Sequence, residues 1–301
     1  MLRSPLIILG FGRSGTTWLS DIISKYTGRL ILFEPYHPCV YQDISDTIYR
    51  TAINAGPLKH HAVSVLSKGN RDKWLLRNHL PSHLEEIDDL YIDHIWSHSE
   101  LLGLKSIRIN THFVPLVKDL NAQVIFIIRH PLAVIASIIN RPRYWEDIGF
   151  DMHWKLLTRS IQDDRLAAIS KKCQDRISQN AFIWSYTNML AYDQLKTLRV
   201  LPLYYEDLYI QPYETATALL KKLDHYHHPI HPSHLFTPSL LGLSTIHSRR
   251  FSALQQGQGS LDFFWNETLN KEELHRIISI IEAVGDIHPA FGELCSARSY
   301  I

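Results

Sequence analysis

The sequence predicts an α/β protein in which a parallel β-sheet is flanked by helices. Residues 5–9 form a short, continuous apolar run, which is typical of a strand buried on both faces of such a sheet. A glycine-containing loop follows from Gly10 to Gly15, and apolar residues then recur at helical spacing over residues 18–23. A strand, a glycine loop and a helix in this order open a nucleotide-binding α/β unit.

The later elements agree with this prediction. Residues 30–33 form a second strand that ends at Glu34-Pro35, because proline interrupts the ladder. Strands are also expected over 101–109, 124–128 and 200–205, the first two of them flanking the first strand. Helices are expected over 133–139, 213–223 and 272–284, and residues 42–102 are irregularly helical. We therefore expect one domain over residues 1–301, with a helical insertion at about 42–102.

Composition narrows the classes of partner. The chain has 31 Lys and Arg against 30 Asp and Glu, so no overall basic field favours nucleic acid or an anionic membrane surface. The three cysteines are widely spaced, outside any metal-ligand pattern, and are expected to be free thiols of a reducing compartment. No apolar run has the length of a signal sequence or a membrane span, so a soluble, cytoplasmic protein is expected.

The glycine loop is P-loop-like, but its register differs from that of the nucleotide triphosphatases. Gly10 and Gly15 have the spacing of a phosphate-binding loop, whereas Thr16 occupies the position of the essential lysine. The missing lysine argues against cleavage of ATP or GTP. A cation stands inside the loop instead, at Arg13, where it could neutralise charge on a leaving group. The alternative is a tight turn with a solvated arginine.

Three blocks of sequence resemble the sulfotransferase family. Arg13-Ser-Gly-Thr-Thr-Trp18 resembles its 5′-phosphosulfate loop, residues 124–137 resemble its strand, Arg-x-Pro and helix serine, and Tyr205-Glu-Asp-Leu208 resembles a later segment. The resemblance implies 3′-phosphoadenosine 5′-phosphosulfate (PAPS) as donor, adenosine 3′,5′-bisphosphate as product, and no metal. It also implies which residues bind the donor. Arg129 and Ser137 would bind the 3′-phosphate, Tyr205 would contribute to the donor site, and Arg249 and Arg250 would lie in a basic loop near the C-terminus. The loop residues that would bind the donor are Arg13, Ser14, Gly15, Thr16, Thr17 and Trp18.

The acceptor side resembles the carbohydrate branch of that family. Phe33-Glu34-Pro35 is similar to its Phe-Glu-Pro, which implies Glu34 as the general base; an exposed strand-end carboxylate is the alternative. The histidine that serves cytosolic members is replaced by Ile107. Lys105 could face the sulfuryl oxygens, and His112 is a reserve base.

Other signals leave the acceptor open. The histidine-rich tract 225–234 and the pair His94 and His98 lack a fitting cysteine or carboxylate spacing, so no metal site is expected. Residues 42–102 and 140–190 are expected to shape the acceptor site, which would take a glycan or another hydroxyl-bearing small molecule. An atypical P-loop kinase and a non-catalytic nucleotide-binding module are the alternative functions.

Overall fold

The computed structural model describes residues 4–37, 56–67, 72–76, 79, 89–97, 99, 101–140, 147–223, 230, 235 and 263–296. Its centre is a five-stranded sheet in the order β2-β3-β1-β4-β5, with all neighbours parallel. The strands are β1 (Leu6–Gly10), β2 (Leu30–Phe33), β3 (Leu102–Ser106), β4 (Gln123–Ile128) and β5 (Leu203–Tyr204). The predicted α/β fold is confirmed, as are β3 and β4 on either side of β1.

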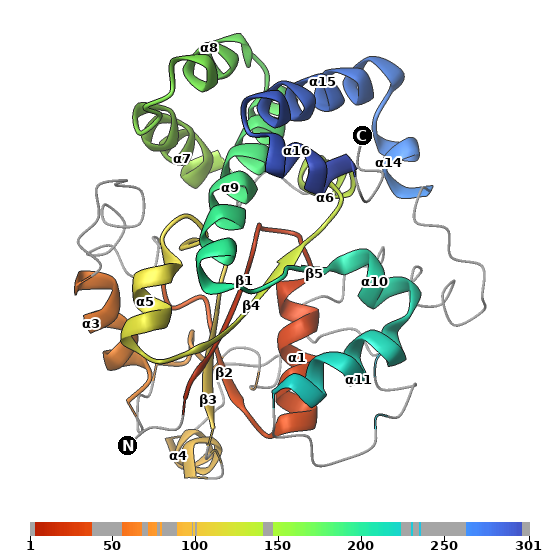
Figure 1. Ribbon diagram of the computed structural model, residues 1–301. Coiled ribbons are helices and arrows are strands. Elements are labelled where there is room, and N and C mark those ends of the chain that lie inside the picture. Colours follow the sequence, from red (N-terminus) through yellow and green to blue (C-terminus); the bar gives the residue numbers. More distant parts are fainter. Residues whose placement is uncertain are drawn as a thin grey trace.

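Two layers of helices cover the sheet (Figure 1). On one face, α1 (Thr16–Thr27), α10 (Tyr205–Ile210) and α11 (Pro212–Lys222) pack on Leu6 and Ile8 of β1 and on Ile127 of β4. On the other face, Ile7 and Leu9 of β1 join a core that includes residues of α3 (Gly56–Val65), α5 (Phe113–Asp119) and α6 (Pro131–Ile139). Alternate residues of β1 therefore face opposite layers, as the continuous apolar run predicts.

A further group of helices lies at one end of the sheet in Figure 1. It consists of α7 (Asp147–Arg159), α8 (Asp164–Lys172), α9 (Arg176–Leu198), α15 (Lys271–Ile287) and α16 (Pro289–Ser296). The helix α14 (Phe263–Thr268) joins this group to α6, because Trp265 stacks on His130 with ring centroids 4.5 Å apart and planes 4° apart. These helices place side chains beyond the carboxyl ends of the strands.

Several boundaries differ from the prediction. β5 has two residues where six were expected, because only Leu203 and Tyr204 pair with β4. The helices α7, α8 and α9 were not predicted, since α9 buries residues on several sides and so lacks a simple apolar stripe. Its start was nevertheless encoded locally, because the Asp175 side chain accepts hydrogen bonds from the amides of Ile177 and Ser178.

The described part of the expected insertion contains α3 and α4 (Asp89–Ser97), and β3 begins at its last residue. Cys173 and Cys295 are buried free thiols, and Cys39 lies outside the described residues. None of the helices in the described part has the length and apolar character that crossing a membrane requires.

Arg29 ties together the amino ends of three strands. Its side chain is 2% exposed and donates to the carbonyls of Ser4 and Leu102 and to Oε1 of Gln123, at 3.3, 3.4 and 3.0 Å. We expect Arg29→Met to lower the free energy of unfolding by about 2–4 kcal/mol, because it leaves buried acceptors without a donor. Urea denaturation measures this loss. Arg165→Met, at an exposed arginine, is the control, and equal stability of the two variants would contradict the assignment.

Candidate active site

The loop between β1 and α1 fits tightly against its neighbours. A Cβ atom on Gly10 would lie 2.5 Å from the carbonyl oxygen of Ile127 in β4. Gly15 has a φ of 89°, and a Cβ there would lie 2.5 Å from the ring of Tyr205. Both positions need glycine, the second for its left-handed backbone as well as for space. The loop is therefore held by β4 on one side and by Tyr205 on the other.

The amino end of α1 directs backbone amides toward the glycine loop, where an anion could bind. Gly15 is the N-cap and supplies no side-chain cap, and the amide of Leu19 is the donor that bonds to the Gly15 carbonyl. The preceding amides, of Thr16, Thr17 and Trp18, have no carbonyl partner within the helix. The Ser14 hydroxyl is fully buried and makes no hydrogen bond with the described residues. These donors and the helix dipole suit a phosphate or a sulfuryl group.

Two arginines converge on this loop. Arg13 adopts a φ of 72° and donates from Nε to the Ser137 hydroxyl of α6 at 3.0 Å. Arg129, which follows β4, donates from Nη1 to the Arg13 carbonyl at 2.8 Å, and its guanidinium lies 4.2 Å from the centroid of the Tyr205 ring. The structure thus brings together four predicted donor-site residues that are far apart in sequence.

The Tyr205-Glu-Asp-Leu208 segment contacts both Arg129 and the residue that follows it. Glu206 accepts a hydrogen bond from the His130 amide at 2.9 Å, which fixes the chain directly after Arg129. Trp18 lies edge-on to Tyr205 with centroids 5.7 Å apart. Its ring is 8% exposed and its Nε1 donates to the Leu235 carbonyl. Trp18 is thus part of the core under the loop.

Glu34 and Lys105 form a buried pair at the ends of β2 and β3. Lys105 Nζ lies 2.7 Å from Glu34 Oε1, and both side chains are 3% exposed. The other carboxylate oxygen, Oε2, accepts from the Ile107 amide at 3.1 Å, and the ammonium lies 3.9 Å from the centroid of the Phe33 ring. Glu34 has a φ of 44°; it and Arg13 are two of four non-glycine residues with positive φ in the described part of the chain. Strained backbone of this kind is frequent at functional sites.

Asn110 connects this pair to the loop. Its side-chain amide donates to the carbonyls of Gly10 and Ile107, at 2.9 and 3.1 Å. Ile107 in turn donates its amide to Glu34, and its side chain lies 3.5 Å from the place of a Cβ on Gly12. Asn110 was not predicted as a site residue, although its position just after a predicted strand marked it as a residue of the carboxyl edge. Hydrogen bonds through Ile107 and Asn110 therefore link the carboxylate to the loop.

Comparison with known proteins assigns the chain to a family. The sequence model described as the Sulfotransferase family matches residues 5–229, which is more than half of the chain and includes the loop, Glu34, Arg129 and Tyr205. The chain belongs to the sulfotransferase family. The search of curated proteins finds no match.

Three solved structures are similar to this sulfotransferase. The sulfotransferase domain of the Synechococcus PCC 7002 olefin synthase is 16% identical, with 92% of this chain and 94% of that chain covered and a TM-score of 0.43. The sulfotransferase domain of the curacin biosynthetic pathway is 15% identical, with 93% and 98% covered and a TM-score of 0.42. A sulfotransferase from Alicyclobacillus acidocaldarius is 11% identical, with 94% and 97% covered and a TM-score of 0.39.

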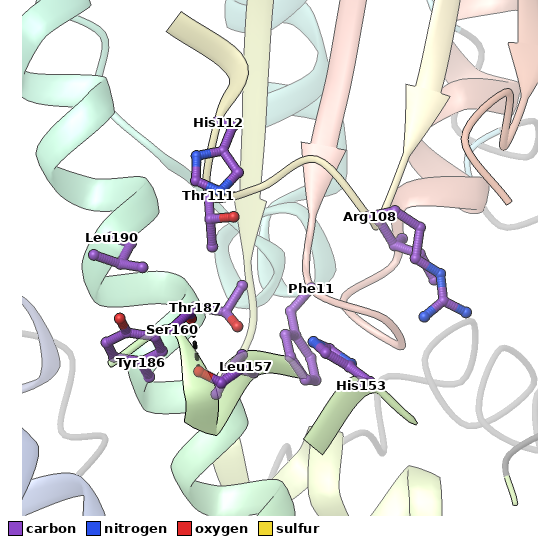
Figure 2. Close-up of a pocket in the computed structure, with 11 residues that line it drawn as sticks. Phe11, Arg108, Thr111, His112, His153, Leu157, Ser160, Tyr186, Thr187 and Leu190 are labelled. Atoms are coloured by element: carbon purple, nitrogen blue, oxygen red, sulfur yellow. Dashed lines mark hydrogen bonds between the residues drawn. The ribbon is translucent and has the colours of Figure 1, made fainter. Parts of the chain in front are cut away.

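A pocket lies beside the loop of this sulfotransferase, and Figure 2 shows the side chains that line it. They come from the loop, from the segment after β3, from α7 and the residue that follows it, and from α9: Phe11, Ile107, Arg108, Thr111, His112, His153, Leu157, Ser160, Tyr186, Thr187 and Leu190. Burial lowers the pKa of His112 to about 4. The pKa of His153 is lowered to about 3 by burial and by the nearby charge of Arg108. Both imidazoles are therefore neutral at neutral pH.

The lowered pKa of His112 predicts how the stability of the protein depends on pH. His112 binds a proton near pH 6.5 in the unfolded chain but only near pH 4 in the folded protein, so the unfolded state gains protons first as the pH falls. We expect the contribution of neutral His112 to the free energy of unfolding to be complete above pH 6.5. At pH 5 this contribution should be smaller by about 1–2 kcal/mol, a value that allows for the partial exposure of the side chain. Urea denaturation at pH 7 and pH 5 tests this. His112→Gln should lose less stability over that range than the unchanged protein, and an equal loss would contradict the assignment.

Several of the predicted site residues lie outside this pocket or outside the described part of the chain. Glu34 and Lys105 are not among the residues that line the pocket, whereas the reserve base His112 is. Arg249, Arg250 and His98 lie outside the described residues, and so does the histidine-rich tract apart from Ile230. The described residues contain no cluster of three or more His, Cys, Asp or Glu that could hold a metal ion. His153 and Thr187 were not predicted as pocket residues, because α7 and α9 carry no recognisable motif.

Proposed function

We propose that this sulfotransferase transfers a sulfuryl group from PAPS to the hydroxyl of a glycan or another hydroxylated metabolite. The observation that carries this proposal is the group formed by Arg13, Ser137 and Arg129 beside the amino end of α1. It combines two cations, a hydroxyl and a helix amino end within one loop region. This is the set of donors that a doubly phosphorylated nucleotide sulfate requires.

The residues present fit such a donor. The amides of Thr16, Thr17 and Trp18, at the amino end of α1, and the buried hydroxyl of Ser14, which makes no hydrogen bond with the described residues, would hold the 5′-phosphosulfate. Arg129 and Ser137 would hold the 3′-phosphate, and Tyr205 supports Arg129 through its ring. Arg249 and Arg250 remain candidates for a basic loop over the nucleotide. When bound, PAPS supplies the activated sulfuryl group.

Arg13 and Glu34 would carry the transfer. The bond from sulfur to the acceptor oxygen forms while the bond from sulfur to the nucleotide phosphate breaks, and the hydroxyl proton passes to a base. Arg13 would neutralise the charge that develops on the leaving phosphate. Glu34 is our candidate base, with Lys105 holding one carboxylate oxygen and the Ile107 amide the other. The resemblance of Phe33-Glu34-Pro35 to the carbohydrate branch supports this assignment.

Donor binding is the first test. In thermal denaturation of the full chain, adenosine 3′,5′-bisphosphate is expected to raise the midpoint without magnesium, because ligands that bind the folded state stabilise it. ATP with magnesium is the comparison. Stabilisation by ATP alone would contradict the proposal and support a kinase.

Transfer is the second test. Full chain with sulfur-labelled PAPS is expected to label hydroxyl-bearing acceptors in a panel of glycans, lipids and small alcohols. Binding of the bisphosphate without labelling of any acceptor, and without release of the bisphosphate from PAPS, would instead support a non-catalytic nucleotide-binding module.

A further inference from the structure

Residues 33–36, at the end of β2, each form a hydrogen bond with the helical insertion. Two of these bonds come from a single turn of the insertion. The Phe33 amide donates to the Leu75 carbonyl at 2.7 Å, and Nε1 of Trp74 donates to the Glu34 carbonyl at 3.2 Å. The Trp74 ring also lies edge-on to the Phe33 ring, with centroids 5.4 Å apart. The insertion therefore fixes the backbone of the residue that we propose as the base.

The helix α3 supplies the other two bonds. Nε2 of His61 lies 2.5 Å from the Pro35 carbonyl oxygen and is the donor, because a carbonyl oxygen only accepts. The hydroxyl of the buried Tyr36 donates to the Leu58 carbonyl at 3.1 Å, and the Tyr36 and His61 ring centroids are 5.4 Å apart. Side chains of the insertion thus hold two successive carbonyls, those of Glu34 and Pro35.

Glu34 needs this support because its backbone is strained. Its φ of 44° lies in the left-handed region, which is unfavourable for a residue with a Cβ atom. Pro35 follows it, and the residue before a proline favours an extended backbone. A strained conformation of this kind persists only where several contacts fix it at once. The hydrogen bonds to this turn therefore decide whether the strained or a relaxed conformation is populated.

The strained backbone sets the place of the Glu34 carboxylate. In this conformation Oε1 meets Lys105 and Oε2 accepts from the Ile107 amide. The Glu34 carbonyl accepts from the His37 amide, at 3.1 Å, as well as from Trp74. Rotation of the backbone at Glu34 would move the carboxylate away from both of its partners. Proton transfer depends on this placement, since a base must lie within hydrogen-bond distance of the proton that it takes.

We propose that Trp74 and His61 are positioning residues for the base. They keep Glu34 in its strained conformation, and they thereby keep its carboxylate between Lys105 and the Ile107 amide. Each acts through the backbone of the turn and not on the reacting atoms. This inference rests on the function proposed above, in which Glu34 takes the proton of the acceptor. It assigns a role in catalysis to the helical insertion.

Trp74→Phe tests the hydrogen bond while keeping an aromatic ring against Phe33. We expect kcat for sulfate transfer to fall about 3- to 10-fold, the factor that corresponds to the net free energy of one hydrogen bond. The KM for PAPS should not change, because the bond to Glu34 lies outside the donor loop. Trp96→Phe, at a tryptophan of α4 that is 3% exposed, is the matched control and should leave kcat unchanged. An unchanged kcat in Trp74→Phe, or an equal loss in the control, would overturn the inference.

His61 provides an independent pair of variants. His61→Leu removes the donor to the Pro35 carbonyl and should lower kcat by a similar factor. His61→Gln keeps a side-chain donor and should retain more of the activity. Circular dichroism confirms that each variant is folded. If folded His61→Leu and His61→Gln were equally active, the hydrogen bond would have no part in placing the base.

Combination with Glu34→Gln separates positioning from a general loss of structure. If Trp74 acts through Glu34, Trp74→Phe should cost no further activity once the base is removed, because residues that act through one another are not additive. Labelled PAPS detects the residual transfer of both chains. An equal loss of transfer with and without Glu34 would show that Trp74 acts elsewhere.

Hydrogen exchange keeps this inference apart from the proposed function. The Ile107 amide donates to Glu34 Oε2, so its exchange rate reports the place of the carboxylate without any substrate. In NMR of the full chain with nitrogen-labelled isoleucine, this amide should exchange about 3- to 10-fold faster in Trp74→Phe and His61→Leu than in the unchanged protein.

The two proposals then fail separately. If adenosine 3′,5′-bisphosphate does not bind and no acceptor is labelled, the proposed function fails. Faster exchange of the Ile107 amide would still support the holding of Glu34 by Trp74 and His61, whereas exchange that is unchanged in both variants would overturn it.

Discussion

Glu34→Gln is expected to reduce sulfate transfer by at least about 100-fold and to lower the free energy of unfolding by about 3–5 kcal/mol. Activity falls because the amide cannot take the proton of the acceptor. Stability falls because Lys105, 3% exposed and 2.7 Å from Glu34 Oε1, is left as a buried charge without its counter-ion. Transfer of labelled sulfate and urea denaturation measure the two losses.

The double variant Glu34→Leu with Lys105→Met separates these effects. Replacing a whole buried ion pair by apolar groups is often neutral or stabilising, so most of the lost stability should return. Transfer should remain absent if Glu34 is the base. His112→Gln is the complementary variant, since this histidine lines the pocket. Full transfer by Glu34→Gln together with its loss in His112→Gln would move the base to His112.

Arg13→Ala is expected to lower kcat by about 100- to 1000-fold, the effect of removing one group that stabilises transition-state charge. The hydrogen bond from Arg13 Nε to Ser137 disappears as well, so the midpoint shift produced by adenosine 3′,5′-bisphosphate should decrease. Stability should change little, because alanine and arginine meet a similar penalty at a φ of 72°. Labelled transfer and thermal denaturation provide the two measurements.

Arg13→Gly and Arg13→Lys are the controls. Glycine adopts the left-handed backbone freely, so the glycine variant should be as inactive as alanine but more stable, by up to about 1 kcal/mol. Lysine keeps the charge and should retain more activity than either. If alanine and glycine differed in kcat, the backbone of the loop and not the guanidinium charge would be the important feature of position 13.

The limits of a strand or helix could be predicted from the local sequence where those limits depend on the element's own residues. Residues 30–33 were predicted within their observed limits, and the run over 124–128 lies inside β4. Both are short apolar stretches bounded by turn residues, so their burial follows from composition. The helix α15 begins one residue before its predicted start because Asn270 forms a capping box with Glu273.

Elements that depend on distant partners were predicted less well. The extent of β5 is set by the two residues of β4 that it pairs with, and its own apolar run continues beyond them. The helix α9 is buried by several neighbours at once, so the periodicity that identifies a surface helix is missing. Thr187 consequently escaped notice, although it lines the pocket next to the loop.

The loop from Gly10 to Trp18 was interpretable from sequence alone. Thr16 in place of a lysine argued against a triphosphatase, and Arg13 indicated a charged leaving group, because both conclusions depend on residue type at a given register. Tertiary structure decided which residues meet there. Parallel pairing of Phe33 with Lys105 brings Lys105 onto Glu34, and the return of α6 brings Ser137 onto Arg13 across 124 residues. Such contacts arise from strand order and register, which no local pattern encodes.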